Sequence, residues 1–254
     1  SLTLSKSTGD DMNGSLLGPE YNEKEICEAL GSFDAVYLRF DEGELLDRVS
    51  ALLEDGKIVG WFQGRMEFGP RSLGNRSILG DPRLVSLQSS INRKVKFRES
   101  FRPFAPAVLE ERSSEYFDLK GSSPYMLKVA NVAESQLKKV LDKEEEGFDR
   151  IKYERSTIPA VTHVDGSARV QTVNKDQNPL FWKLLKCFES KTNCGVLLNT
   201  SFNVRGEPVV CTPEDAYRCF VNTSIDWLAI GPFLLKRGDQ PEAKPQQEFD
   251  PIPD

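Results

Sequence analysis

The spacing of apolar residues switches repeatedly between a helical and an extended period along the chain. Apolar positions three or four residues apart are typical of amphipathic helices, whereas short apolar runs rich in β-branched and aromatic residues are typical of buried strands. Helices are predicted over residues 23–30, 41–54, 84–95, 179–191 and 213–221. Strands are predicted over residues 57–63, 104–109, 125–132, 161–173, 195–200 and 227–235. Because the two kinds of element interleave, the sequence predicts an α/β fold.

Two of the predicted helices carry clear boundary signals. The helix over 213–221 has Thr212 as its N-cap, Pro213 at its first position and two acidic residues in its first turn. The helix over 41–54 is followed by Gly56, which can adopt the left-handed conformation that commonly ends a helix. Its predicted inward residues are Leu45, Leu46, Val49 and either Leu52 or Leu53.

The two ends of the chain differ in composition from its middle. Residues 1–20 mix Ser, Gly, Asp and Asn with little periodicity, which is typical of a linker or of the remnant of a missing N-terminal domain. Residues 21–238 form the predicted α/β domain, and residues 239–254, rich in Pro, Gln and acids, form a predicted flexible tail. The charge run at 142–149 is typical of a solvated helix end or loop.

Composition and charge narrow the class of protein. With 39% hydrophobic and 28% charged residues and a formal net charge of −6, the chain has the make-up of a soluble globular protein. The acidic balance argues against a protein that coats nucleic acid or an anionic membrane, although it is compatible with a local basic site. No apolar run approaches the roughly 18 residues of a membrane helix, and the first residues lack a signal peptide's apolar stretch, so a cytoplasmic location is expected. The five cysteines are scattered without a CxxC pair, which favours buried structural thiols.

Arginine and glycine concentrate in a first segment, residues 64–78, directly after the predicted strand at 57–63. Glycines allow a backbone to approach a ligand closely, and a guanidinium group can bind two oxygens of one phosphate or carboxylate at once. This segment therefore favours an anion site. The alternative is a tight turn whose surface arginines pair with Glu67 and Asp81.

Basic and aromatic residues alternate in a second segment, residues 93–106. Such alternation fits a nucleic-acid groove, in which bases stack on rings and phosphates contact Lys and Arg. The sequence RPFAP at 102–106 instead indicates a rigid strand entry that would hold Arg102 in one orientation, as a pocket residue requires. For Arg93 and Lys94, a solvated basic helix end is the alternative.

A third group of polar residues follows two predicted strands, over 163–171 and 197–208. Asn199, Ser201 and Asn203 share one strand face if that strand continues so far, and small polar groups there suit a carboxamide or phosphate ligand. Gly166 is expected to bend the strand that begins near His163. Since His163 is the chain's single histidine, a transition-metal site or a serine triad is not expected, and a structural role is the alternative to a general base. The sequence also lacks a Walker A loop.

Four long motifs, taken together, give a specific resemblance. In chain order they are GRMEFGPRSLGNRSI, KFRESFRPFAPAV, THVDGSARVQTV and LLNTSFNVRGEPVV. This series resembles the C-terminal region of the O-carbamoyltransferase family that includes the nodulation protein NodU and the cephamycin enzyme CmcH. The resemblance covers about residues 18–236.

The resemblance implies a YrdC-like domain, with a twisted mixed sheet and packed helices, that forms carbamoyl adenylate from carbamoyl phosphate and ATP with Mg. A separate actin-like N-terminal domain, which holds the family's histidine-containing metal site, would then transfer the carbamoyl group to a hydroxyl. No transition metal is therefore expected in this chain. The substrate-binding residues carried over by motif are Arg71, Lys96, Arg102, Arg169, Asn199 and Ser201.

Roles for five of these six residues are expected from the same resemblance. Arg71, Lys96 and Arg102 are expected to hold phosphates, and Asn199 and Ser201 the carbamoyl end. Of the six, Lys96, Arg102 and Ser201 are the expected catalytic residues. Two other functions compete with carbamoyl activation: an RNA-binding YrdC-like module, although nucleic acid is the less favoured partner, and a domain that only docks to its partner domain.

Overall fold

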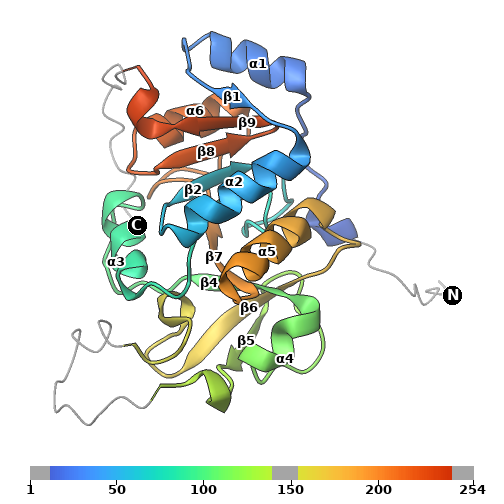
Figure 1. Cartoon of the computed structure of the whole chain (residues 1–254), viewed down its shortest axis with the longest axis vertical. Helices are drawn as coiled ribbons and strands as arrows, with labels where there is room; N and C mark the ends of the chain where they lie inside the picture. Colours follow the sequence, from blue (N-terminus) through green and yellow to red (C-terminus); the bar gives the residue numbers. More distant parts are fainter. Residues whose placement is uncertain (1–11, 139–153, 242–254) are drawn as a thin grey trace, which may run out of the picture.

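The computed structural model describes residues 12–138 and 154–241, so the charge run at 142–149 lies outside the described residues. Within them, nine strands form one mixed sheet in the order β1-β9-β8-β2-β3-β7-β4-β6-β5 (Figure 1). The strands are β1 (Leu38–Arg39), β2 (Val59–Phe62), β3 (Arg76–Gly80), β4 (Ala105–Leu109), β5 (Lys128–Asn131), β6 (Ser167–Val173), β7 (Val196–Ser201), β8 (Trp227–Ile230) and β9 (Phe233–Lys236). The pairs β2–β8 and β4–β6 are parallel, and the other neighbours are antiparallel.

Helices cover both faces of this sheet. They are α1 (Glu23–Gly31), α2 (Glu42–Glu54), α3 (Val85–Lys94), α4 (Ser113–Tyr116), α5 (Pro179–Thr192) and α6 (Pro213–Val221). Helices α2 and α5 lie side by side on one face, and α6 lies on the opposite face (Figure 1). The predicted α/β fold with a mixed sheet and packed helices is thus confirmed. None of the helices in the described part of the chain is both long and apolar enough to cross a bilayer.

Local capping explains why the predicted helices lie close to their observed bounds. In α6, the Thr212 side chain accepts a hydrogen bond from the Asp215 amide at 3.2 Å, and Pro213 is the first helical residue. In α2, Asp41 accepts from the Glu44 amide at 2.8 Å. Leu53 of α2 is fully buried, which resolves the choice between Leu52 and Leu53.

Two predicted strands are wrong in extent. The strand predicted over 161–173 begins only at Ser167, because Pro159–Val161 forms a 3-10 turn and Gly166, with φ of 78°, donates to the His163 carbonyl at 3.0 Å. The strand predicted over 227–235 is instead the hairpin β8–β9, which turns at Gly231 with φ of 52°. The sequence interpretation also missed β1 and β3.

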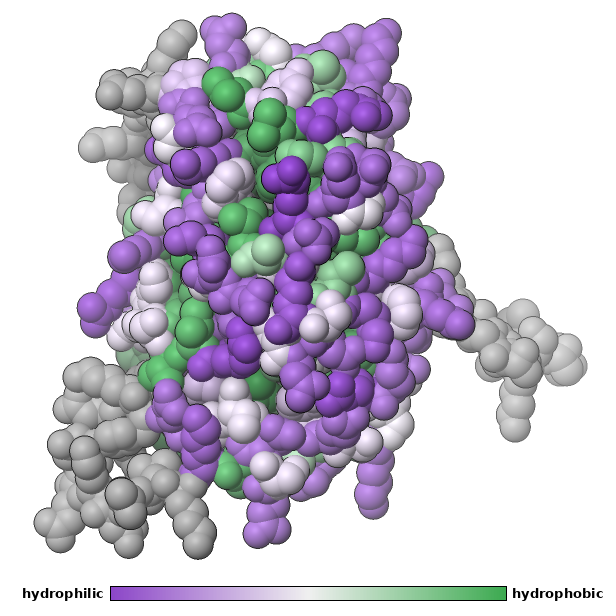
Figure 2. Space-filling view, viewed as in Figure 1, coloured by the Kyte–Doolittle hydropathy of each residue, from purple (hydrophilic) through white to green (hydrophobic). Residues whose placement is uncertain are grey.

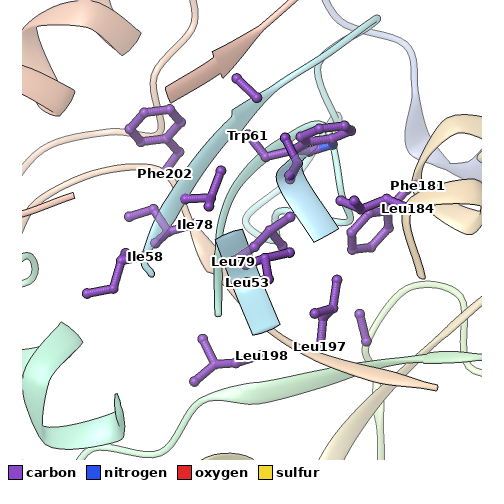
Figure 3. Packing of buried hydrophobic residues seen from close by; sticks show 14 of the residues in the cluster. Leu53, Ile58, Trp61, Ile78, Leu79, Phe181, Leu184, Leu197, Leu198 and Phe202 are labelled. Carbon is purple, nitrogen blue, oxygen red and sulfur yellow. The ribbon is translucent and has the colours of Figure 1, made fainter. Parts of the chain in front are cut away.

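The core is built from apolar side chains of the central strands and the helices that cover them. Figure 3 shows Trp61 of β2 close to Phe181 and Leu184 of α5, with Leu79 of β3 and Leu197 of β7 nearby, and all five are fully buried. The outer surface of the α2–α5 face is covered mainly by hydrophilic side chains (Figure 2). The apolar stripes of these helices therefore face the sheet.

The described ends of the chain pack against the domain. The Gly18 amide donates to the Met66 carbonyl at 2.9 Å, and the Met66 amide donates to Pro19 at 2.9 Å, so this part of the predicted linker lies along the arginine-glycine segment. At the other end, the Gln240 side chain donates to the Val36 carbonyl at 2.8 Å. Residues 239–241 of the predicted flexible tail are thus part of the folded domain, and 242–254 lie outside the described residues.

Gly74 is the position where the fold most clearly requires glycine. Its φ is 111°, and a Cβ there would lie 2.2 Å from Cδ1 of the fully buried Phe181. We expect Gly74→Ala to lower the free energy of unfolding by about 3 kcal/mol, measured by urea denaturation. Gly166→Ala is the control, because its φ is also positive but no atom lies within 4 Å of the added methyl group. Equal losses of unfolding free energy in the two variants would show that the contact with Phe181 is not the reason why position 74 requires glycine.

Candidate functional site

The strand order brings the polar segments of the sequence to one end of the sheet. Strand β7 runs antiparallel to β3 and β4, with Ser201 opposite Ser77 and Asn199 opposite Ala105. Strand β6 runs parallel to β4. The carboxyl end of β7 therefore lies beside the amino ends of β3, β4 and β6. Each polar segment leads into or out of one of these strands, so segments far apart in the sequence meet there.

Two adjoining pockets lie at this end of the sheet. The first, here named the Asn199 pocket, has a volume of about 140 Å³ and the polar lining Arg71, Ser72, Arg98, Arg169, Asn199, Thr200 and Ser201. The second, named the Lys96 pocket, has a volume of about 260 Å³ and the polar lining Lys96, Arg98, Arg102, Ser201, Asn203 and Arg205. Arg98 and Ser201 belong to both. The structure thus places all six residues named from the motifs around one continuous region.

Lys96 is a buried cation surrounded by oxygen atoms. Its Nζ donates to Oδ1 and the main-chain oxygen of Asn203 at 2.8 and 3.0 Å, to Ser201 Oγ at 3.3 Å, and to the Ser201 carbonyl. Burial and the nearby Arg98 lower the pKa of Lys96 to about 7, while Cys219 acts in the opposite direction. An anion in this pocket would stabilise the charged ammonium.

Of the three arginines around Lys96, Arg98 is held by neutral groups, whereas Arg102 and Arg205 pair with the carboxylate of Glu99, Arg205 at 3.9 Å. Arg98 lies over the Phe104 ring at 5.1 Å from its centroid and donates from Nε to Asn92 Oδ1 at 2.7 Å. Burial and Arg102 lower the pKa of Arg98. Arg102 itself pairs with Glu99 at 3.1 Å. None of the described residues that line the two pockets carries a carboxylate.

Arg71 and Arg169 add two more guanidinium groups to the Asn199 pocket. Within the described residues neither forms an ion pair with a carboxylate. Burial and the charge of Arg71 lower the pKa of the half-buried Arg169. Like charges that lack internal partners favour binding of an anion between them.

The loop that carries Arg71 is organised by the buried carboxylate of Glu67. Its Oε1 accepts hydrogen bonds from the amides of Leu73 at 2.6 Å and Asn75 at 2.7 Å. The alternative in which surface arginines pair with Glu67 and Asp81 is therefore wrong, since Asp81 instead pairs with Arg83 at 2.6 Å. Glu67 fixes the loop through backbone amides and leaves Arg71 unpaired.

The other arginines of the first segment have structural roles. Arg76 is fully buried, lies 3.6 Å from the centroid of the Phe62 ring, and donates to the carbonyls of Gln63 and Asn75 at 2.9 Å. Arg65 lies 3.5 Å from Glu20. The sequence favours an anion site for the segment as a whole, but of its arginines Arg71 alone lines either of the two pockets described here.

Three further residues from the basic and polar segments lie outside both pocket linings. Arg93 and Lys94 are exposed in the last turn of α3, as the solvated helix-end alternative predicted. His163 Nδ1 lies 3.2 Å from Ser167 Oγ in the turn before β6. In the described ranges, no three His, Cys, Asp or Glu side chains gather to bind a metal. The cationic pocket linings do not fit direct coordination of Mg²⁺, which prefers oxygen ligands.

Sequence reasoning did not single out Ser72, Arg98 or Arg205 as site residues. Arg98 lies between Lys96 and Arg102 in the same motif, and Ser72 follows Arg71, so each was within a segment that had been identified. The six expected residues were carried over from the family motifs; that Ser72, Arg98 and Arg205 also face the pockets depends on loop conformations, which local spacing does not encode.

Residues 50–237 match the family model described as Carbamoyltransferase C-terminus. The chain belongs to this family. An uncharacterized protein of Synechocystis sp., sll1178, is 52% identical over 94% of this chain and 40% of its own length. The nodulation protein NolO of Bradyrhizobium diazoefficiens is 43% identical over 73% of this chain and 31% of its own length. The 3'-hydroxymethylcephem-O-carbamoyltransferase of Amycolatopsis lactamdurans is 36% identical over 76% of this chain and 33% of its own length.

This chain therefore spans 40% or less of the length of these curated relatives. Among solved structures, full-length HypF in its phosphate- and nucleotide-bound form matches 81% of this chain and 22% of its own. The sequence identity is 13% and the TM-score is 0.44, a likeness too low to carry an argument about this chain.

The lowered pKa of Lys96 predicts pH-dependent anion binding. Because the folded pKa is about 7, the charged form is lost as the pH rises through that value. Sulfate keeps its charge over this range, so its affinity is expected to fall up to about twentyfold between about pH 6.5 and about pH 8.5 by linkage. Isothermal titration calorimetry at several pH values measures the sulfate affinity. Lys96→Met should abolish its pH dependence, and Lys94→Met should keep it. A sulfate affinity of the wild-type chain that does not change with pH would contradict the role of Lys96.

Proposed function

We propose that the chain is the carbamoyl-activating part of an O-carbamoyltransferase, which binds carbamoyl phosphate and ATP and forms carbamoyl adenylate. The observation that carries this proposal is the pair of adjoining pockets, lined by several cations and no carboxylate, beside the buried amide of Asn199. Two phosphorylated substrates require concentrated positive charge, and a carbamoyl group requires a neutral hydrogen-bonding site. The family match and the name of one relative, the 3'-hydroxymethylcephem-O-carbamoyltransferase of Amycolatopsis lactamdurans, support carbamoyl chemistry.

The two pockets divide the substrates between them in this proposal. The Asn199 pocket takes carbamoyl phosphate, with its phosphate at Arg71 and Arg169. The Lys96 pocket takes the phosphates of ATP, with Arg98 at the boundary. Water releases phosphate from carbamoyl phosphate to give carbamate, and a carbamate oxygen then displaces pyrophosphate from the α-phosphorus of ATP. The chain contributes by positioning these groups and stabilising the charge on the leaving phosphates.

Transfer of the carbamoyl group to a hydroxyl acceptor belongs, in the same proposal, to a separate actin-like N-terminal domain. The curated relatives have more than half of their length outside the match, which leaves room for such a domain in them. Mg²⁺ would enter as the partner of ATP, and we assign none of the pocket residues to it because their cationic side chains do not fit a divalent cation.

Carbamoyl adenylate formation tests the proposal directly. Mass spectrometry should detect carbamoyl-AMP after the purified chain is mixed with carbamoyl phosphate and Mg-ATP, with phosphate release followed in parallel. Lys96→Ala is expected to reduce the product by about 100-fold or more, because it removes the buried charge that faces the phosphates. Arg93→Ala, an exposed charge at the end of α3, is the matched control and should leave the yield unchanged.

Other outcomes separate the parts of the proposal. Phosphate release without adenylate would mean that the carbamoyl phosphate site is present and that nucleotide chemistry needs another domain. Full activity of Lys96→Ala would contradict the assignment of the Lys96 pocket. If the wild-type chain neither reacts with nor binds carbamoyl phosphate, the enzymatic function of this chain is wrong.

A second candidate function, RNA binding, has one observation in its favour. Phe97 and Phe101 are 55% and 43% exposed beside the basic residues of the Lys96 pocket, as in a groove where bases stack. Contacts to an RNA backbone weaken steeply with salt, whereas binding to an enclosed small-molecule site depends on it less. We expect carbamoyl phosphate affinity to change less than about tenfold between about 50 and about 200 mM salt by calorimetry. Tight, salt-sensitive binding of single-stranded RNA that Phe97→Ala abolishes would favour RNA instead.

A further inference from the structure

The amide of Asn199 is held in one orientation by contacts behind the Asn199 pocket. Its Nδ2 donates to the main-chain oxygen of Ser72 at 3.1 Å and to Oε1 of Gln171 at 2.7 Å. Gln171 in turn donates from Nε2 to the main-chain oxygen of Leu73 at 2.7 Å. Because a carbonyl oxygen only accepts hydrogen bonds, the two main-chain carbonyls fix which end of each amide is nitrogen.

This orientation leaves Asn199 with one unused group, the acceptor Oδ1. Both of its N–H donors are occupied, and Oδ1 is buried with no hydrogen-bond partner among the described residues. Ser72 Oγ, in the same pocket lining, is also buried and has no partner there. The two residues are only 1% and 4% exposed. Buried polar atoms normally have partners, so this pair indicates a ligand that supplies them.

We propose that Asn199 Oδ1 and Ser72 Oγ form a subsite that selects a primary carboxamide, and that Gln171 is the positioning residue that fixes the Asn199 amide. Asn199 Oδ1 accepts an N–H from the carbamoyl nitrogen, and the Ser72 hydroxyl donates to the carbamoyl oxygen. This inference rests on the proposed function, since the carboxamide is the carbamoyl end of carbamoyl phosphate.

The subsite explains how the Asn199 pocket can distinguish one acyl phosphate from another. Arg71 and Arg169 attract any phosphate, so charge alone does not recognise the carbamoyl end. A ligand with a methyl group in place of the amine brings no N–H to Asn199 Oδ1 and leaves that buried acceptor unpaired. A site built to hydrogen-bond a substrate N–H rejects an analogue that lacks it.

Two stable phosphonates test the selection without turnover. Phosphonoacetamide and 2-oxopropylphosphonate differ only by an amine in place of a methyl group. By calorimetry, the wild-type chain is expected to bind phosphonoacetamide about tenfold more tightly. Gln171→Leu is expected to lower that ratio several-fold and to leave the affinity for 2-oxopropylphosphonate unchanged, because it releases the Asn199 amide that distinguishes the amine from the methyl group. Ser72→Ala removes the donor to the carbonyl oxygen that both ligands carry, so it is expected to weaken the binding of both by a similar several-fold factor and to keep the ratio. Ser50→Ala, at a buried serine in α2 that lies outside both pocket linings, is the control and should keep both wild-type affinities and their ratio.

The outcomes separate this subsite from the proposed function. If the wild-type chain binds neither phosphonate and also fails to bind carbamoyl phosphate, the proposed function fails. If the wild-type chain turns over carbamoyl phosphate but shows no preference between the phosphonates, or Gln171→Leu keeps the tenfold ratio, or Ser72→Ala leaves both affinities unchanged, the function stands and the subsite is wrong. If Gln171→Leu does not fold, the wild-type preference tests Asn199 Oδ1 and the affinities of Ser72→Ala test Ser72 Oγ, because Ser72→Ala removes one hydroxyl and keeps the carbonyl that accepts from Asn199.

Discussion

The antiparallel pairing of β7 with both β3 and β4 is the constraint on which the rest of the site depends. It sets the carboxyl end of β7 beside the amino ends of β3 and β4. The amino end of β6 lies at the same edge of the sheet, because β6 runs parallel to β4. Three loops that are rich in cations are thereby forced into one region. A shift of β7 by one residue would turn Asn199 and Ser201 to the other face of the sheet. The hydrogen-bond ladder therefore determines both the fold and the chemistry.

A cluster of cations must be held without being neutralised if it is to bind an anion. For Lys96 and Arg98 the protein does this with neutral acceptors and an aromatic face: Lys96 lies among oxygens of Ser201 and Asn203, and Arg98 lies over Phe104. Arg102 and Arg205, by contrast, share the carboxylate of Glu99. The contacts of Lys96 and Arg98 replace part of the lost hydration but leave the charge in place. The fully buried Arg76 uses the same kind of partners, carbonyl oxygens and a ring, for a structural purpose.

The sequence predicts the elements whose signals are local. The predicted N-cap Thr212 locates the start of α6, because a cap acts on the first turn alone, and the helical spacing of apolar residues places the start of α2 to within one residue. Strand β3 was missed because it begins with the polar Arg76 and Ser77, which are buried only through their neighbours in the sheet. The same limit applies to the site: motifs indicate which segments carry the cations, but side-chain direction depends on the tertiary structure.

Charge and direction have separate sources in this site. Most of the cations, among them Arg71, Lys96 and Arg102, lie on loops, where long side chains can adjust to phosphates that carry charge on every side. The neutral amides of Gln171 and Asn199 lie within β6 and β7, where Asn199 is paired with strands on both sides and Gln171 is paired with β4. Recognition of a planar carboxamide needs donors and acceptors at fixed angles, which rigid strands supply and loops do not. In the proposed subsite, the amides that would select the carboxamide nitrogen therefore lie in the sheet, whereas Ser72 and most of the cations lie in the loops that surround it.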